Sequence, residues 1–134
     1  MEYLLNIVPA VAVGLQITLK IFLITIVLSL PLGILMSVGR ISKIMPLRKC
    51  MGAYIYIMRG TPLMLQILFI YYGLPFIIEG LKLPDFPAAI IAFVLNYAAY
   101  FAEIFRGGIQ SIDRGQYEGA KVLGMNYVQT MRRI

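Results

Sequence analysis

The side chains able to do chemistry in this sequence are few, and most of them lie within apolar stretches. Asn96, Tyr100 and Glu103 recur at four- and three-residue spacing, so on a helix they share one face. An enzyme built on Glu103 would need a second catalytic group, and none appears near it. The chain has no His and Cys50 stands alone, which excludes imidazole catalysis, disulfide frameworks and Cys/His metal sites. We therefore expect no catalytic residue, no metal and no cofactor on this chain.

Polar groups within apolar stretches suit a transport path better than catalysis. Such groups are rare in lipid and face a bundle interior or a pathway. One interpretation is that this face lines a translocation path or an interface between two subunits. The residues concerned are Thr61, Gln66, Asn96, Tyr100 and Glu103.

The alternative for the same face is an interhelical hydrogen-bond network. In it, Glu103 pairs with Arg59 or Arg106 near the cytoplasmic surface, and both arginines anchor their helices at the membrane interface. We favour this pairing for Glu103, because ionisable groups near the ends of spans are commonly paired. For Asn96, which lies deeper, both interpretations stay open.

Composition places the chain in a membrane. Of its 134 residues, 60% are hydrophobic and 13% charged, with a mean hydropathy of +0.85. Soluble domains have about 45–50% apolar and about 25% charged residues. Three apolar runs predict spans at about 10–38, 57–78 and 86–105, since about 20 residues cross the hydrocarbon core. We expect an all-α membrane protein forming a single transmembrane domain over residues 1–134.

Charge predicts the orientation of these spans. The net charge is +6, and basic residues gather in segments 40–59 and 106–134. Basic loops stay in the cytoplasm, so both segments are expected inside and the N-terminus outside. The charge then marks loops, and nucleic acid is not an expected partner. The N-terminus lacks a basic region and a cleavage site, so the first run is expected to remain in the mature protein.

The start of the second run allows two structures. Pro62 suits the first turn of a helix, where its missing N–H is not needed. Alternatively, residues 52–58 are already helical along the membrane surface, and Pro62 kinks a continuous helix.

A coupling segment of about 107–134 follows the third run. Residues 116–123 are expected to form a short helix, with Gly124 as the left-handed residue that ends it and Asn126 as the cap of a second helix. Small side chains at Gly119 and Ala120 allow another protein to approach the backbone. The alternative is a helix lying on lipid head groups, which normally has a bulky apolar stripe that this helix lacks.

Spacing in this segment resembles a known motif. Glu118-Gly119-Ala120, Gly124 four residues later and Ile134 ten after that are similar to the EAA motif of ABC importer permeases. In that family the motif forms the coupling helix, which docks on the ATP-hydrolysing subunit. Gly119 replaces the usual Ala, at a cost of about 1 kcal/mol in helix propensity. The resemblance assigns docking to Gln116, Tyr117, Glu118, Gly119, Ala120, Lys121, Leu123 and Gly124.

Two further stretches resemble the polar amino acid branch of the same family. Residues 59–66 read Arg-Gly-Thr-Pro-Leu-Met-Leu-Gln, and residues 99–108 read Ala-Tyr-Phe-Ala-Glu-Ile-Phe-Arg-Gly-Gly. The resemblance implies a permease subunit of a polar amino acid importer in a bacterial inner membrane, with ATP hydrolysis on a separate subunit. It also implies three protein partners: an ABC ATPase, a second permease subunit, and a periplasmic or extracellular solute-binding protein.

The family's subunit has about five spans, two of them after the coupling segment. We therefore expect this sequence to be an incomplete, N-terminal portion of a type I importer permease. The alternative is a self-contained three-span scaffold or channel-like protein whose C-terminal segment is an interaction tail. The transported amino acid, and whether the permease pairs with itself or with a sister subunit, stay open.

Overall fold

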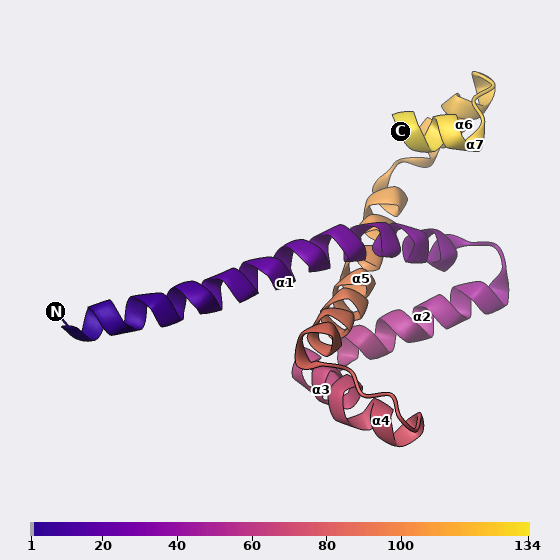
Figure 1. The fold of residues 1–134 in the computed structure, drawn as a ribbon. Helices are drawn as coiled ribbons and strands as arrows, with labels where there is room; N and C mark the ends of the chain where they lie inside the picture. Colours follow the sequence, from indigo (N-terminus) through magenta and orange to yellow (C-terminus); the bar gives the residue numbers. More distant parts are fainter. Residues whose placement is uncertain (1) are drawn as a thin grey trace.

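The chain folds into helices joined by short connections (Figure 1). The structure is a computed structural model that describes the backbone of residues 2–134 and the side chains of residues 7–134. Within that part of the chain there are no strands, as the all-α prediction requires. The elements in order are α1 (Glu2–Ile41), α2 (Met45–Gly60), α3 (Leu63–Leu68), the π-helix η1 (Phe69–Gly73), α4 (Leu74–Ile77), α5 (Asp85–Ser111), α6 (Arg114–Val122) and α7 (Tyr127–Arg133).

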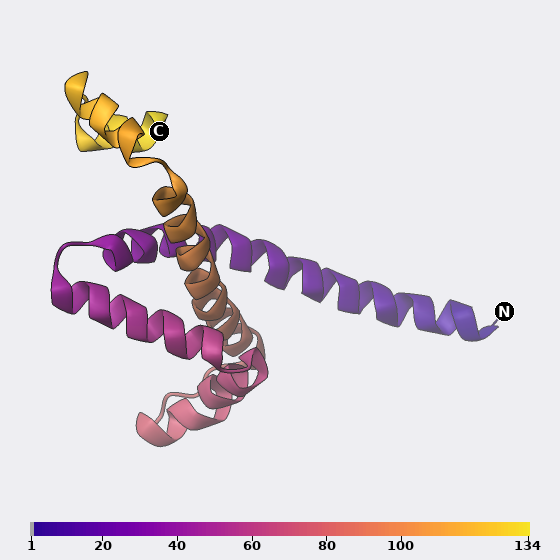
Figure 2. The same ribbon diagram turned by 180° about the vertical axis from the view of Figure 1, so that it is seen from behind.

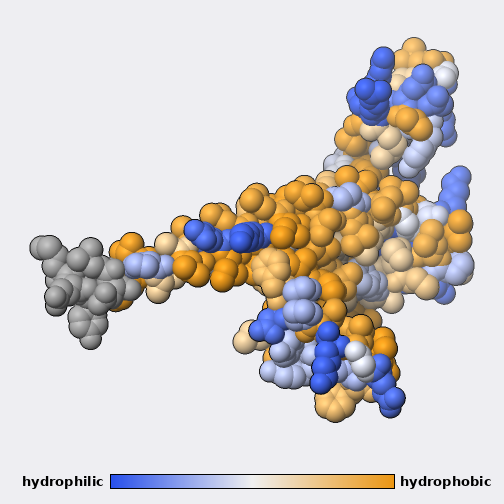
Figure 3. Space-filling view, viewed as in Figure 1, coloured by the Kyte–Doolittle hydropathy of each residue, from blue (hydrophilic) through white to orange (hydrophobic). Residues whose placement is uncertain are grey.

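Two helices are long and apolar enough to cross a membrane, and a bent pair makes a third candidate. The two are α1, from Ile7 to Ile41, and α5. The pair is α2 with residues 63–77, which meet at an angle of 107°. Apart from one hydrophilic patch midway along α1, apolar side chains cover the long helices in Figure 3. Hydrophilic groups gather on α6–α7, around the α3–α4 end and at the turn from α1 into α2. This distribution agrees with the three apolar runs in the sequence.

The second run is not one straight helix. Residues 52–58 are helical, as one of the two interpretations held, but α2 ends at Gly60 and the chain turns sharply. Thr61 is extended (φ −114°, ψ 143°), the conformation that the residue before a proline prefers. Pro62 then caps α3, close to the first-turn position that the other interpretation gave it. The expected span of 57–78 is therefore divided at residues 61–62.

Small residues allow α1 to cross α5 closely. Ser29 and Ser37 are fully buried on α1, and Gly33 lies between them at four-residue spacing. A Cβ atom on Gly33 would lie 2.6 Å from the Cβ of Phe101 and 3.2 Å from the carbonyl oxygen of Ala98. In lipid, helices associate through such close backbone packing rather than through the hydrophobic effect. Figures 1 and 2 show the crossing in the C-terminal half of α1.

The two ends of α5 extend its expected span. The helix begins at Asp85 and continues to Ser111, so residues 107–111 belong to α5 and not to the coupling segment. Gly107 and Gly108 do not end it, because the helical ladder continues and Ser111 Oγ donates back to the Gly108 carbonyl at 2.7 Å. The coupling segment is thereby attached to a continuous membrane helix.

Candidate functional site: a charged pocket and a C-terminal hairpin

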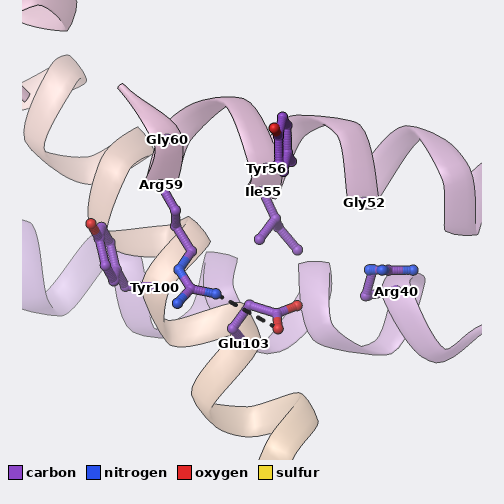
Figure 4. A pocket seen from close by; sticks show the side chains of 8 residues that line it. All are labelled: Arg40, Gly52, Ile55, Tyr56, Arg59, Gly60, Tyr100 and Glu103. Carbon is purple, nitrogen blue, oxygen red and sulfur yellow. Dashed lines mark ion pairs between the residues drawn. The ribbon is translucent and has the colours of Figure 1, made fainter. Parts of the chain in front are cut away.

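A cavity of about 390 Å³ opens between α1, α2 and α5 (Figure 4). α1 contributes one residue, α2 five and α5 two. The lining residues are Arg40, Gly52, Ile55, Tyr56, Arg59, Gly60, Tyr100 and Glu103. Charged and aromatic side chains thus converge where the consecutive helices α1 and α2 meet the more distant α5.

Glu103 is the acidic residue of this cavity and pairs with two arginines. Arg106, one turn further along α5, donates from Nε at 3.0 Å and from Nη2 at 2.6 Å, so the contact is bidentate. Arg59 Nη1 lies 3.7 Å from Glu103 Oε2 and connects α2 to α5. The Glu103 side chain is 18% exposed. The pairing interpretation of Glu103 is confirmed, with both candidate arginines present together.

Arg59, expected as an interfacial anchor, lies in the last turn of α2 and lines the cavity. Its guanidinium carbon lies 5.3 Å from the ring centroid of Tyr100, within cation–π range. Figure 4 shows the side chain leaving the end of α2 and pointing to Glu103. With 45% of its side chain exposed, Arg59 remains accessible to a charged ligand.

Arg40 is a cavity residue that sequence reasoning missed. It comes from the last turn of α1, where the sequence indicated only the end of a span. Its guanidinium packs over Gly52, whose added Cβ would lie 3.1 Å from the guanidinium carbon. Among the described residues, its buried Nε has no hydrogen-bond partner. Only the meeting of α1 with α2 could reveal this role.

Three of the five residues expected on the path do not line this cavity. Gln66 Nε2 donates to the Met58 carbonyl at 3.0 Å and to Thr61 Oγ1 at 2.8 Å. Asn96 Nδ2 donates to the same Met58 carbonyl at 3.1 Å and to Gln66 Oε1 at 3.0 Å. Asn96 is 5% exposed. Thr61, Gln66 and Asn96 thus form a hydrogen-bond network at the helix break, while Tyr100 and Glu103 face the cavity.

Local chemistry shapes the C-terminal hairpin of α6 and α7. Asp113 caps α6 by accepting from the Gly115 amide at 3.1 Å, so the helix begins two residues before the expected Gln116. Gly124 has φ +71°, and its left-handed conformation ends the turn after α6. Asn126 caps α7 in a capping box with Gln129, both hydrogen bonds measuring 2.9 Å. The predictions for Gly124 and Asn126 are confirmed.

The two small residues of α6 do not share one open face. Gly119 has no atom within 4 Å of an added Cβ, so its surface is free in this structure. Ala120 is only 3% exposed, and its carbonyl accepts from the Met125 amide at 3.0 Å. Ala120, expected beside Gly119 on an open surface, is instead buried in this structure. Val122 and Leu123 are 87% and 78% exposed and form an apolar edge. Leu123 is among the residues that the resemblance assigned to docking, and Val122 is not.

A family comparison identifies the chain. Residues 29–134 match the model of the binding-protein-dependent transport system inner membrane component. The chain belongs to this family. Its members are membrane permease components of ABC transporters rather than enzymes.

Individual relatives of this permease component are amino acid permeases. It is 42% identical over 125 residues to the arginine transport system permease protein ArtQ of Bacillus subtilis, covering 93% of this chain and 57% of that protein. It is 36% identical over 137 residues to the putative glutamine transport system permease protein GlnP of Rickettsia typhi, covering 100% of this chain and 62% of that one. The chain thus spans about three fifths of the length of these relatives.

A solved structure shares the fold of this permease component. A crystal structure of an amino acid ABC transporter with histidines superposes with a TM-score of 0.86 at 37% identity. The match covers 96% of this chain and 59% of the other. The bent α2–α3 pair and the α1–α5 crossing thus belong to a permease fold.

Proposed function

We propose that this chain acts in an ABC importer of polar amino acids and that the charged cavity lies on its translocation path. The observation that carries the proposal is the pair Arg59 and Glu103, which places opposite charges 3.7 Å apart in one accessible cavity. An amino acid carries a carboxylate and an ammonium group on neighbouring atoms. Arginine binds carboxylates and a carboxylate binds ammonium through charge-assisted hydrogen bonds, so this cavity has both partners.

Arg40 strengthens the carboxylate-binding side. Its guanidinium lines the same cavity and is not matched by a second acidic lining residue. The three charged lining residues are two arginines and one carboxylate, so the cavity has an excess of one positive charge before Arg106 is counted. An entering carboxylate would compensate this excess, while its ammonium group meets Glu103.

The hairpin is proposed as the docking element for a partner ATPase. Support comes from the resemblance of residues 118–134 to the coupling motif, from the open surface at Gly119, and from the exposed edge at Val122 and Leu123. α6 follows α5 after two residues, so a displacement of α6 is transmitted to the helix that carries Glu103. Rocking of helix bundles about a central path is the general form of alternating access.

The remaining partners and the orientation belong to the same proposal. A second permease subunit and a periplasmic or extracellular solute-binding protein would complete the transporter in the lipid bilayer of a bacterial inner membrane. The N-terminus would lie outside, because the basic residues gather in segments 40–59 and 106–134. Basic residues favour the cytoplasmic side.

Equilibrium binding and partner capture test the proposal. The chain is purified in lipid nanodiscs, and the binding of radiolabelled L-arginine and L-glutamine is measured with L-leucine as the comparison. In parallel, the chain is co-expressed with the amino acid ABC ATPases of the same genome. We expect saturable binding of a polar amino acid and co-purification of one ATPase. Absence of binding and of an ATPase would refute the proposal.

A further inference from the structure

The break between α2 and α3 leaves backbone carbonyls that need hydrogen-bond donors. The last four carbonyls of any α-helix have no partner within the helix, and in an apolar environment such groups must be satisfied by other donors. Thr61 Oγ1 donates to the Ile57 carbonyl at 2.8 Å. The Met58 carbonyl receives two amide donors, Gln66 at 3.0 Å and Asn96 at 3.1 Å.

The two amides also bind each other and connect three helices. Asn96 Nδ2 donates to Gln66 Oε1 at 3.0 Å, so an amide from α5 and an amide from α3 converge on one carbonyl of α2. Asn96 is almost fully buried, which protects these bonds from competition by water. The position of Met58 is consequently set by side chains from the two helices that flank it.

Arg59, the next residue after Met58, reaches Glu103 from this position. Asn96, Tyr100 and Glu103 lie along one face of α5 at helical spacing. On this face, Asn96 donates to the Met58 carbonyl. The Tyr100 ring and the Glu103 carboxylate both contact the Arg59 guanidinium, at 5.3 Å and 3.7 Å. A shift of Met58 along α5 would move Arg59 away from both partners.

We propose that Gln66 and Asn96 are positioning residues that hold Arg59 opposite Glu103 in the amino acid cavity. Neither residue lines the cavity, so each acts through the Met58 carbonyl and not by touching a ligand. This inference rests on the proposed function, because it assigns the two amides to the geometry of the amino acid site. The hydrogen bond from Thr61 Oγ1 to the Ile57 carbonyl also satisfies the end of α2. It does not connect α2 to α5, so Thr61 is not included among the positioning residues.

A distance measurement tests the positioning without any ligand. Spin labels are attached at Tyr56 on α2 and Ile104 on α5, which are 81% and 63% exposed, in a Cys50→Ser background that removes the native thiol. Gln66→Met and Asn96→Leu remove the amide donors at similar side-chain size. Gln16→Met, on an exposed part of α1, is the matched control. We expect one narrow distance distribution in the parent and control, and a shifted or broadened one in both amide variants.

A double-mutant cycle tests whether the two amides act through Arg59. Binding of L-arginine and of L-glutamine is measured for Asn96→Leu, Arg59→Met and the double variant in nanodiscs. Asn96→Leu alone is expected to weaken binding about tenfold, as loss of one well-placed charged contact would. In the Arg59→Met background the same substitution should cause no further loss. If Asn96 had only a structural role, the losses of binding free energy from the two substitutions would add, because their effects would be independent.

The outcomes separate this inference from the function on which it rests. Unchanged spin-label distances in both amide variants, or additive losses in the cycle, would overturn the positioning role. Absence of amino acid binding by the parent chain would refute the proposed function, and the distance measurement would still decide whether the amides position α2 against α5. If Asn96→Leu yields no helical, monodisperse protein, Asn96→Asp takes its place, since it keeps the side-chain shape and removes the amide donor.

Discussion

Arg59 at the end of α2 lies 3.7 Å from Glu103 on α5, although 43 residues lie between them in the sequence. Glu103 also accepts two hydrogen bonds from Arg106 of its own helix. The Arg106–Glu103 pair within α5 orients the carboxylate, and the Arg59–Glu103 pair connects α2 to α5. This division leaves Arg59, the more exposed arginine, able to exchange its partner for a ligand carboxylate.

Replacing Glu103 by Gln should weaken amino acid binding and leave the fold intact. The substitution keeps the side-chain shape but removes the charge that an ammonium group would meet. A hydrogen bond to a charged group contributes about 1.5–3 kcal/mol, so Kd should rise roughly tenfold to a hundredfold. Equilibrium binding of L-arginine in nanodiscs measures this, with Glu118→Gln on the exposed hairpin as the control for charge. Equal affinities of parent and Glu103→Gln would contradict the proposed path.

Replacing Gly33 by Leu should destabilise the packing of α1 on α5. The first atom of the new side chain already lies 2.6 Å from the Phe101 Cβ, closer than real contacts allow. Overpacking of a close-packed site costs about 1–3 kcal/mol. Gly14→Leu is the control, because nothing lies within 4 Å of its added Cβ. Thermal unfolding in detergent should show a lower midpoint for Gly33→Leu only; equal midpoints would contradict this helix crossing.

Replacing Gly124 by Ala should loosen the end of α6. The residue has φ +71°, a conformation that costs an L-residue with a Cβ about 1–2 kcal/mol. Gly119→Ala, in the helical part of α6, should instead stabilise the helix by about 1 kcal/mol, because Ala has a higher helix propensity than Gly. Amide hydrogen exchange over residues 114–133 reports both changes. Slower exchange in Gly124→Ala than in the parent would show that this turn does not require a glycine.

Replacing Gly119 by Trp should abolish capture of the ATPase while membrane insertion is retained. The added ring occupies the open surface of α6, where nothing lies within 4 Å of an added Cβ. Gly107→Trp is the control, since Gly107 also has free space but lies on α5 outside the hairpin. Co-purification with the ATPase and carbonate extraction of membranes measure the two properties. An unchanged yield of ATPase with Gly119→Trp would argue against docking at this face.

Features whose causes lie within a few residues were predictable from the sequence. The left-handed Gly124, the capping of α7 by Asn126 and the long apolar helices depend on local hydrogen bonds, backbone sterics and composition. The pairing of Glu103 was likewise predictable in kind, because a buried carboxylate near a basic span end seeks a cation. The sequence named Arg59 and Arg106 as alternative partners, and only the structure showed that both pair with Glu103 at once.

Tertiary structure alone decided which polar residues share a site. The chain bends by 107° after α2, and Gln66 and Asn96 bind the Met58 carbonyl at this break instead of lining the cavity with Tyr100 and Glu103. The meeting of α1 with α2 brings Arg40 into the cavity, and Ala120 of the hairpin is buried. Sequence spacing determines which residues share a helix face. It does not determine which other helix meets that face, because helix crossings depend on close contacts between residues far apart in the chain, such as Gly33 with Phe101.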